Sequence, residues 1–382
     1  MSTLKVNTIR HTGASSDAIT LAADGTAAIG ECTAKITNNL SNRNLIINGD
    51  FQVAQRGTSS TSGGFQTVDR FQNVRGGMDE ASTQAQHALT SSDTGPWEKG
   101  FRYSYHLTNG NQTSGAEASD YNIIRYNIEA QDMATCGWDY TSASSYITLS
   151  FWVKSSVAQN FYGNLLTGDG TMQNYPYETG SLSANTWTKI TKKIPGNANL
   201  QFDNNNGAGF QIDLWAFGGS TYTASPALNT WAAYASGTRM PANTSTWWTT
   251  NDATFEMTGL QLEVGDVATD FEHRSYGDEL LRCERYFQKI DYQVGSGSSG
   301  LKPYYYSNIP FKTEMRDDPS LYASSGYEDD SGNFVTYVDG DYTTQTTGCT
   351  LDSASRSQVT VHGGSGSTYH WIKGRVHLAA EL

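Results

Sequence analysis

The chain has 382 residues, of which 37% are hydrophobic and only 16% charged. Lys and Arg number 25 against 38 Asp and Glu, so the formal net charge is -13. No basic run exceeds Lys192-Lys193, which argues against nucleic-acid binding through phosphate neutralisation. No apolar stretch approaches the length of a membrane span, so membrane insertion is not expected.

Residues 1–43 form a leader with few apolar side chains. One short strand is expected near its start, and residues 17–29 predict a β-hairpin about the Asp24-Gly25 turn. So few apolar side chains do not bury a core within one chain. We therefore expect three copies to associate here, which makes this an attachment and trimerisation segment. A flexible tail is the alternative.

Residues 44–274 alternate strand-like runs with polar turns, the pattern of an all-β jelly-roll sandwich. In the clearest run, residues 146–154, every second side chain is apolar and the others face the opposite side. Three tryptophans within predicted strands are expected to be packing residues rather than glycan contacts: Trp152, Trp187 and Trp215. Strands are predicted over residues 45–51, 101–107, 121–128, 147–154, 186–194, 209–216 and 253–264.

An amphipathic helix is predicted over residues 278–290, because Leu280, Cys283, Phe287 and Ile290 share one side of it. It makes residues 275–290 a helical neck, in which three parallel copies meet or the helix packs on its own sandwich. Residues 291–382 then predict a smaller C-terminal β domain, with strands at 334–338, 358–361 and the closing run 371–382.

The segments that bracket the sandwich, Asn44–Arg56 and Thr258–Gln288, resemble tail fibre and other tail-associated receptor-binding proteins of bacteriophages. Residues 2–9 resemble the start of tail proteins from short-tailed marine and cyanobacterial phages, and residues 309–321 resemble a segment of fibre tips. The sandwich is similar to jelly-roll carbohydrate-binding modules.

These resemblances imply a non-enzymatic virion protein of the tail, assembled in the host cytoplasm. It would act as a homotrimer, contact other phage tail proteins through residues 1–43, and adhere to a host surface glycan or lipopolysaccharide. Two alternatives stay open. One is a structural virion protein, such as a tail adaptor, nozzle component or capsid-decorating knob; the other is a glycan depolymerase.

Candidate glycan contacts are aromatic residues in polar surroundings, because sugar faces stack on aromatic rings. Trp247 and Trp248 lie in the polar run 241–251, and Trp231 is nearby. Tyr304, Tyr305 and Tyr306 follow a Gly/Ser loop at the start of the C-terminal domain. Some of these rings would instead belong to the core.

The resemblance to jelly-roll carbohydrate-binding modules, which often hold structural calcium near the first and last strands, implies a possible calcium site. Asp50, Asp252 and Glu256 offer the hard oxygen ligands that calcium prefers, near the first and last strands of the sandwich. Turn-forming acids are the alternative. The seven His residues show no zinc spacing, and the four Cys residues lie far apart, which favours free thiols.

Overall fold

The computed structural model consists of two compact units, Met1–Arg43 and Asn44–Leu382. It describes residues 8–9, 19–21, 27–29, 42–295, 304–321, 334–338, 341–345, 350–364 and 371–382. Among these residues, none of the helices combines the length and apolar character that crossing a bilayer requires.

The first unit contains a small antiparallel sheet of three strands, β1 (Thr8–Ile9), β2 (Ile19–Leu21) and β3 (Ala27–Ile29). Ile19 lies opposite Ile29, so β2 and β3 pair as the predicted hairpin. The turn at Asp24-Gly25 lies outside the described residues, and the association of three copies stays a prediction.

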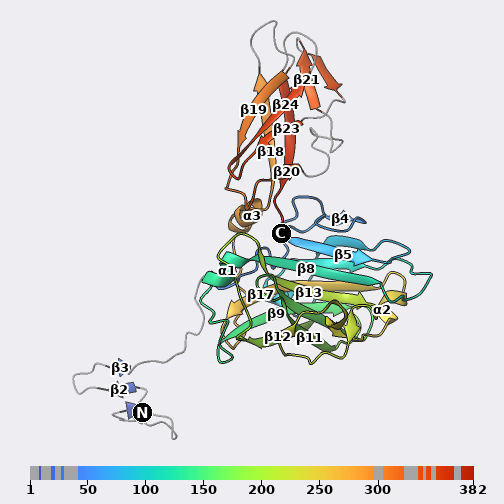
Figure 1. Ribbon diagram of the computed structural model, residues 1–382, viewed down its shortest axis with the longest axis vertical. Helices are drawn as coiled ribbons and strands as arrows, with labels where there is room; N and C mark the ends of the chain where they lie inside the picture. Colours follow the sequence, from blue (N-terminus) through green and yellow to red (C-terminus); the bar gives the residue numbers. More distant parts are fainter. Residues whose placement is uncertain are drawn as a thin grey trace, which may run out of the picture. The chain divides into compact units, whose positions relative to one another are not determined.

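The second unit contains a sandwich of two six-stranded sheets, which confirms the predicted all-β jelly-roll class (Figure 1). The β9–β17 sheet has the order β12 (Thr188–Pro195), β9 (Tyr146–Ser155), β17 (Thr254–Val264), β7 (Tyr103–Thr108), β6 (Thr83–Ala88) and β4 (Ser59–Ser60). The β8–β13 sheet has the order β15 (Ala232–Ala233), β11 (Gln173–Ser181), β10 (Asn160–Thr167), β13 (Ala208–Gly218), β8 (Tyr121–Glu129) and β5 (Phe71–Gly76). The sequence prediction missed β5, β6, β10 and β11.

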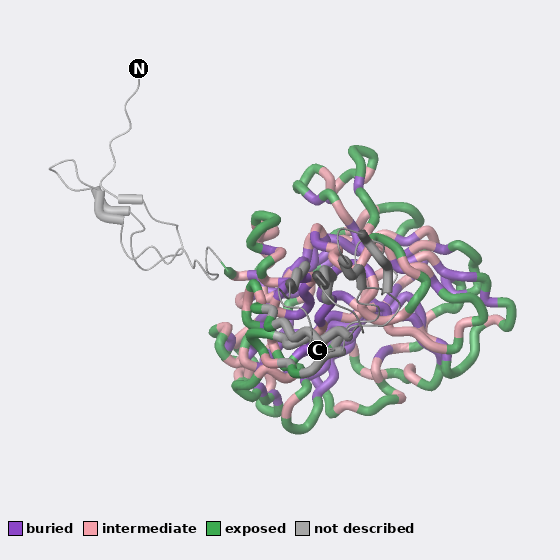
Figure 2. The backbone as a smooth tube through the Cα atoms, turned by 90° about the horizontal axis from the view of Figure 1, so that it is seen from above, coloured by how far each residue is buried: buried purple, intermediate pink, exposed green. Residues whose placement is uncertain are grey.

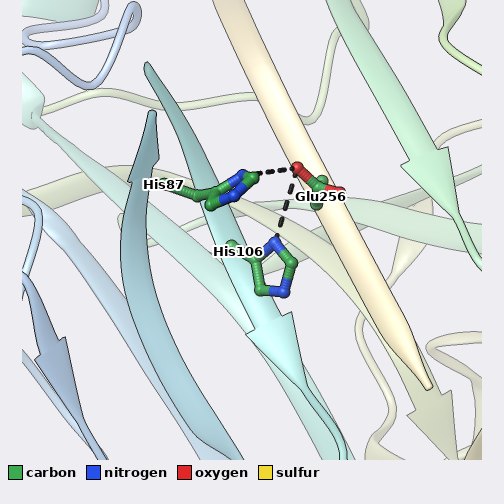
Figure 3. Close-up of side chains that lie close together, drawn as sticks. All are labelled: His87, His106 and Glu256. Carbon is green, nitrogen blue, oxygen red and sulfur yellow. Dashed lines mark ion pairs between the residues drawn. The ribbon is translucent and has the colours of Figure 1, made fainter. Parts of the chain in front are cut away.

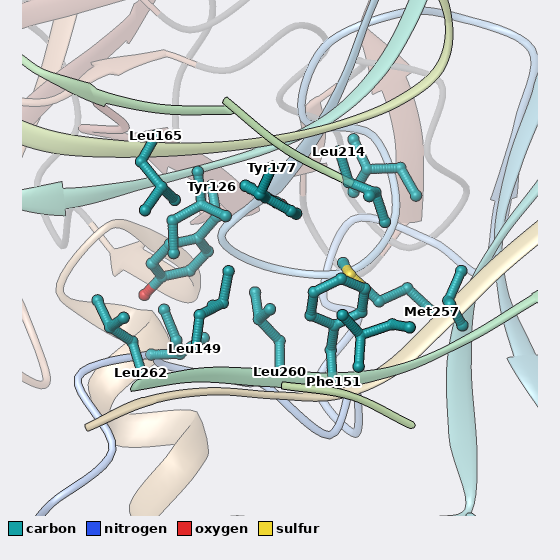
Figure 4. Close-up of a cluster of buried hydrophobic side chains, with 14 of the residues drawn as sticks. Tyr126, Leu149, Phe151, Leu165, Tyr177, Leu214, Met257, Leu260 and Leu262 are labelled. Atoms are coloured by element: carbon teal, nitrogen blue, oxygen red, sulfur yellow. The ribbon is translucent and has the colours of Figure 1, made fainter. Parts of the chain in front are cut away.

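The hydrophobic core fills the space between these two sheets. The alternation predicted for residues 146–154 is confirmed, because Ile147, Leu149, Phe151 and Val153 of β9 are all buried. Buried residues gather in the interior of the sandwich, and most exposed residues lie in loops at its periphery (Figure 2). Figure 4 shows the side chains of the two sheets pointing toward one another, among them Tyr126, Leu165, Tyr177, Leu149, Phe151 and Leu262.

Residues 45–51 do not form the predicted strand. They form an irregular segment that lies alongside β17. Two backbone hydrogen bonds of 2.9 Å hold it there, from Leu45 N to Leu262 O and from Leu260 N to Gly49 O. Gly49 is required here, because a Cβ would lie 2.1 Å from the carbonyl oxygen of Leu260. The side-chain carbonyl of Asn48 accepts from Val53 N at 2.9 Å and turns the chain. Side-chain hydrogen bonds have therefore replaced a regular ladder.

The predicted helix over 278–290 is shorter than expected. Helix α3 spans Tyr276–Glu284 and begins at Ser275, whose hydroxyl accepts a hydrogen bond from Asp278 N. Phe287 and Ile290 belong instead to β18 (Phe287–Gly295), which pairs along its whole length with β25 (Trp371–Ala379). The helix ends at Glu284, and from Phe287 onward the backbone pairs with β25 instead of continuing the helix.

The C-terminal strands form two further sheets, and the strands predicted at 334–338, 358–361 and 371–382 are confirmed. One sheet has the order β18-β25-β21-β22, with β20 (Ser320–Leu321) also on β25, and the other has the order β19-β24-β23. Their remaining strands are β19 (Tyr304–Pro310), β21 (Phe334–Val338), β22 (Asp341–Gln345), β23 (Thr350–Ala354) and β24 (Gln358–Gly364).

Short elements complete the second unit, namely α1 (Ala130–Thr135), α2 (Thr246–Thr249), β14 (Thr223–Ala224), β16 (Met240–Pro241) and two 3-10 turns, Trp97–Lys99 and Ser236–Thr238. Ion pairs tie the sandwich to the residues after it: Arg70 lies 2.6 Å from Glu381, and Arg285 lies 2.8 Å from Glu129. Cys136 and Cys283 are free thiols, as expected.

Candidate functional site

The outer face of the β9–β17 sheet collects the polar side chains that the core excludes. On β9, Ser150, Trp152 and Lys154 alternate with the buried apolar residues and therefore point away from them. Strand register then places Lys154 opposite Glu256 of β17. It also places Trp152 opposite Lys189 of β12.

A cavity of about 280 Å³ opens on this face. We call it the Trp152 cavity; its aromatic walls are Trp152, Phe101, Phe271 and His273, and its polar lining includes Glu98, Lys189 and Asp270. Phe271 lies 4.9 Å from both Phe101 and His273 between ring centroids, so the three rings support one another. Such a mixture of rings and polar groups is typical of small-ligand sites.

Two glycines let the chain close around these rings. Gly259 has φ +65°, and a Cβ there would lie 2.6 Å from Cζ of Phe101, so only glycine fits beneath that ring. Gly95 has φ +96°, and its Cβ would lie 2.8 Å from Cζ3 of Trp152. The loop that carries Gly95 therefore packs directly on the edge of the indole.

The charged residues and His273 around the Trp152 cavity are exposed, and His273 is held by a hydrogen bond to the backbone. His273 is exposed, but its Nε2 lies 2.8 Å from the carbonyl oxygen of Lys99, which holds the imidazole at the cavity. Glu98, Lys189 and Asp270 are exposed at the rim. Hydroxyl groups of a ligand that rests on the indole would find carboxylate acceptors and an ammonium donor there.

A buried ionic network lies beside the Trp152 cavity on the same face. Glu256, only 3% exposed, lies 3.0 Å from Lys154 Nζ and accepts a 3.0 Å hydrogen bond from Ser104. Lys154 continues to Asp93 at 2.9 Å, and the indole of Trp187 donates to the same carboxylate oxygen at 3.0 Å. Trp187 and Trp152 thus lie on the polar face, where both are partly buried. The sequence predicted both as packing residues rather than glycan contacts.

Two imidazoles complete this network. His87 Nδ1 and His106 Nδ1 each lie 3.4 Å from Oε2 of Glu256 (Figure 3). Burial alone would raise the pKa of Glu256, but His106 and Lys154 outweigh it and lower that pKa to about 2. For Lys154, burial would lower the pKa, and the Glu256 and Asp93 carboxylates raise it instead.

The three tryptophans named as candidate glycan contacts are buried in the core, which was the alternative left open, so they are not glycan contacts. Trp247 and Trp248 are both 0% exposed, and their indole N–H groups donate to Thr254 O and Gly115 O. Trp231 is 8% exposed and donates to Pro195 O. Each ring fills the core while a loop or strand carbonyl satisfies its single donor, a common solution for buried tryptophan.

The tyrosine candidates give no comparable result. The backbone of Tyr304, Tyr305 and Tyr306 lies in β19, and the positions of their side chains lie outside the described part of the chain. Their role in glycan contact stays a prediction.

The proposed calcium ligands do not converge, which corrects the expectation of a site made by Asp50, Asp252 and Glu256. In the described part of the chain, the one group of three close His, Cys, Asp or Glu ligands contains Glu256 but neither aspartate. Asp252 is exposed in the turn before β17. Burial and the nearby Glu279 raise the pKa of Asp50 to about 6, and its Oδ1 makes no hydrogen bond.

Comparison with known proteins finds no matching family model, and no curated protein matches the chain. Similar solved structures include carbohydrate-binding modules and a phage tailspike domain. The enzymatically active domain of tailspike protein 4 from bacteriophage CBA120 is 9% identical with a TM-score of 0.31, over 58% of this chain and 21% of that one. This chain thus spans about a fifth of that tailspike domain.

Two binding modules show the same low level of likeness. The N-terminal cellulose-binding domain of a Cellulomonas fimi β-1,4-glucanase is 10% identical with a TM-score of 0.27, over 57% of this chain and all of that one. The CBM22-1 xylan-binding domain of Paenibacillus barcinonensis Xyn10C is 11% identical with a TM-score of 0.26, over 55% of this chain and 94% of that one. The fold class rests on the sheets described above, since likeness at this level carries no ligand with it.

Proposed function

We propose that this chain is a glycan-binding adhesin of a virion, a tail fibre protein that attaches the particle to its host. The observation that carries the glycan-binding part is the Trp152 cavity, where an indole and three further rings meet carboxylates and a lysine. Its volume lies just below the range usual for small-ligand pockets, which suits one terminal sugar unit.

The mechanism combines stacking with hydrogen bonding. The apolar face of a sugar ring packs on Trp152, while Glu98, Asp270 and Lys189 bond its hydroxyl groups. The tail-fibre part rests on the resemblance of residues 44–56, 258–288 and 309–321 to phage tail proteins. Trimerisation through residues 1–43 would present three such cavities together, and linked weak sites bind far more tightly than one.

The first experiment tests the cavity. Full-length protein is screened on a printed array of bacterial surface polysaccharides, and affinity for any bound glycan is then measured by biolayer interferometry. Trp152→Ala is expected to weaken binding roughly 10-fold or more, since it removes the central aromatic contact. The thermal unfolding midpoint of the variant shows whether the sandwich is intact.

Tyr234→Ala is the matched control. Tyr234 is a partly exposed aromatic residue that follows β15, at the edge of the other sheet, and Arg239 lies 5.4 Å over its ring. It should retain wild-type affinity. Loss of binding in Tyr234→Ala with full affinity in Trp152→Ala would move the site to the β8–β13 sheet and overturn the assignment.

The rival functions have separate readouts. Release of reducing ends from the bound polysaccharide would make the protein a depolymerase. Antibody labelling of virions at distal tail appendages supports the fibre, whereas labelling of the capsid or the tail neck supports a structural virion protein. Light scattering reports whether three chains of 41.7 kDa associate.

A further inference from the structure

His87, His106 and Glu256 belong to three neighbouring strands, β6, β7 and β17, and lie close together (Figure 3). The residues on either side of His106 and Glu256 are in the core, so these two side chains point to the outer face of the sheet. Register places His106 directly opposite Glu256 and opposite Ala85 of β6. His87, two residues beyond Ala85, lies on the same side of β6. The pairing of the strands therefore brings together ligands that are far apart in sequence.

We infer that these three side chains bind one divalent transition-metal ion of the zinc type. In a tetrahedral zinc site with bonds of about 2.0–2.1 Å, neighbouring ligand atoms lie roughly 3.3–3.4 Å apart. Both imidazole Nδ1 atoms lie 3.4 Å from Oε2 of Glu256, and the three ligand atoms lie within 4.8 Å of one another. A separation of up to 4.8 Å exceeds the tetrahedral spacing, so the half-exposed His87 ring must rotate toward the ion before all three atoms bind it.

The remaining atoms of the ligands are already held by partners. His106 Nε2 lies 3.1 Å from the hydroxyl of Thr108, while its buried Nδ1 has no hydrogen bond and faces Glu256. Oε1 of Glu256 lies 3.0 Å from Lys154. Such outer partners orient metal ligands and fix which atom faces the ion.

Charge and access also favour a dication. With neutral imidazoles, Glu256, Asp93 and Lys154 together carry one net negative charge. The two carboxylates therefore outweigh the repulsion between the Lys154 ammonium and a dication. The side chain of His87 is 50% exposed, which leaves an entry path and a fourth position for water. Two nitrogens and one oxygen suit zinc, cobalt, nickel or copper, whereas calcium and magnesium prefer oxygen alone.

The ion would connect β6, near the edge of the sheet, to the central strand β17. Stabilisation on loading follows, because an ion that binds only the folded chain shifts the unfolding equilibrium. This inference is independent of the glycan proposal, since it uses none of the side chains that line the Trp152 cavity.

The test uses full-length, tag-free protein after dialysis against EDTA. Isothermal titration with Zn²⁺ should give one site per chain with micromolar or tighter Kd, and Co²⁺ should give the visible absorption of a tetrahedral site. His87→Ala and His106→Ala should each weaken Zn²⁺ binding roughly 10- to 100-fold or more. Because His87 is half-exposed, its variant is expected to fold, and Zn²⁺ should no longer raise its unfolding midpoint.

His273→Ala is the matched control, because it removes an exposed histidine that lies outside the cluster. It should bind Zn²⁺ as the wild type does. The inference fails if wild-type protein binds no stoichiometric Zn²⁺, if His87→Ala and His106→Ala leave the affinity unchanged, or if Ca²⁺ competes at equal concentration.

Discussion

The two outer faces of the sandwich both bury charge, yet they satisfy it in different ways. On the β8–β13 sheet, Asp213 is fully buried and receives both arms of one guanidinium, with Arg125 Nε and Nη2 at 2.7 and 2.9 Å. On the β9–β17 sheet, Glu256 is shared among Lys154, Ser104 and two imidazoles. Asp213 thus has one bidentate partner, whereas Glu256 makes single contacts with several groups.

The aromatic residues differ in the same direction. On the β8–β13 sheet, Trp215 is fully buried, its ring lies 5.8 Å from that of Tyr222, and its Nε1 donates to Asn164. Trp152 on the opposite sheet is only partly buried and lines a cavity. Asp213 and Trp215 have their polar atoms satisfied within the fold, whereas the partly exposed Trp152 lines a cavity that can take a ligand.

The largest effect is expected on the β8–β13 sheet. Asp213→Ala leaves the Arg125 guanidinium without its bidentate partner, and breaking a buried pair costs about 3–5 kcal/mol. The midpoint of thermal unfolding should fall by roughly 6–20 °C. Differential scanning calorimetry measures it.

The double variant Arg125→Met, Asp213→Leu is the control, because replacing both charges by apolar groups is often nearly neutral. It should recover most of the loss. If Asp213→Ala unfolds at the wild-type temperature, the pair does not stabilise this face and the contrast between the two faces is wrong.

Asp50 shows what happens to a partly buried carboxylate without a matched cation. Its pKa is raised to about 6 by burial and by Glu279, so the folded state favours the protonated form. The stability gained from protonation is fully present below the unfolded pKa near 3.8 and is lost as the pH rises through about 6. The change in the free energy of unfolding caused by Asp50→Asn should therefore be roughly 2–3 kcal/mol more favourable at pH 8 than at pH 4.

Urea denaturation of both proteins at the two pH values, with EDTA present, measures this difference. The comparison across pH cancels any change in hydrogen bonding that the amide itself introduces. A variant whose stability tracks the wild type at both pH values would show that Asp50 is ionised without cost.

The local alternation of apolar and polar residues was sufficient to predict the central strand β9 and the face that it buries. The alternation along residues 146–154 gave both the core side of β9 and the polar side that carries Trp152. The same alternation placed Trp152 on the side of the strand opposite the apolar residues, where the structure has it. Alternation of apolar and polar residues assigns side chains to the two faces of a strand, but it does not show whether the polar face carries a cavity.

Contacts between distant segments decided the rest. Ser104 and Glu256 are 152 residues apart, and only strand register reveals that they and the two histidines meet. Trp247 and Trp248 occupy a polar stretch, yet their rings find the core through Phe255 and Phe217, at 6.4 and 4.9 Å between centroids. Composition of a loop therefore does not predict the burial of its aromatic rings.

The smallest effect is expected for a single hydrogen bond in the network around Glu256. Trp187→Phe keeps the aromatic bulk but removes the N–H that donates to Asp93 at 3.0 Å. Part of the Asp93 carboxylate's support is lost, although Lys154 and the Thr90 backbone N–H still bond it. A hydrogen bond to a charged group in this partly buried setting contributes about 1–1.5 kcal/mol.

A double-mutant cycle with Asp93→Asn isolates that contribution, because losses from ring packing cancel between the two backgrounds. Urea denaturation should give a coupling energy of about 1 kcal/mol between positions 93 and 187. Zero coupling would mean that the indole packs on Lys154, 4.8 Å from its ring centroid, without supporting the carboxylate. The polar face would then be organised by the lysine rather than by the Trp187 hydrogen bond.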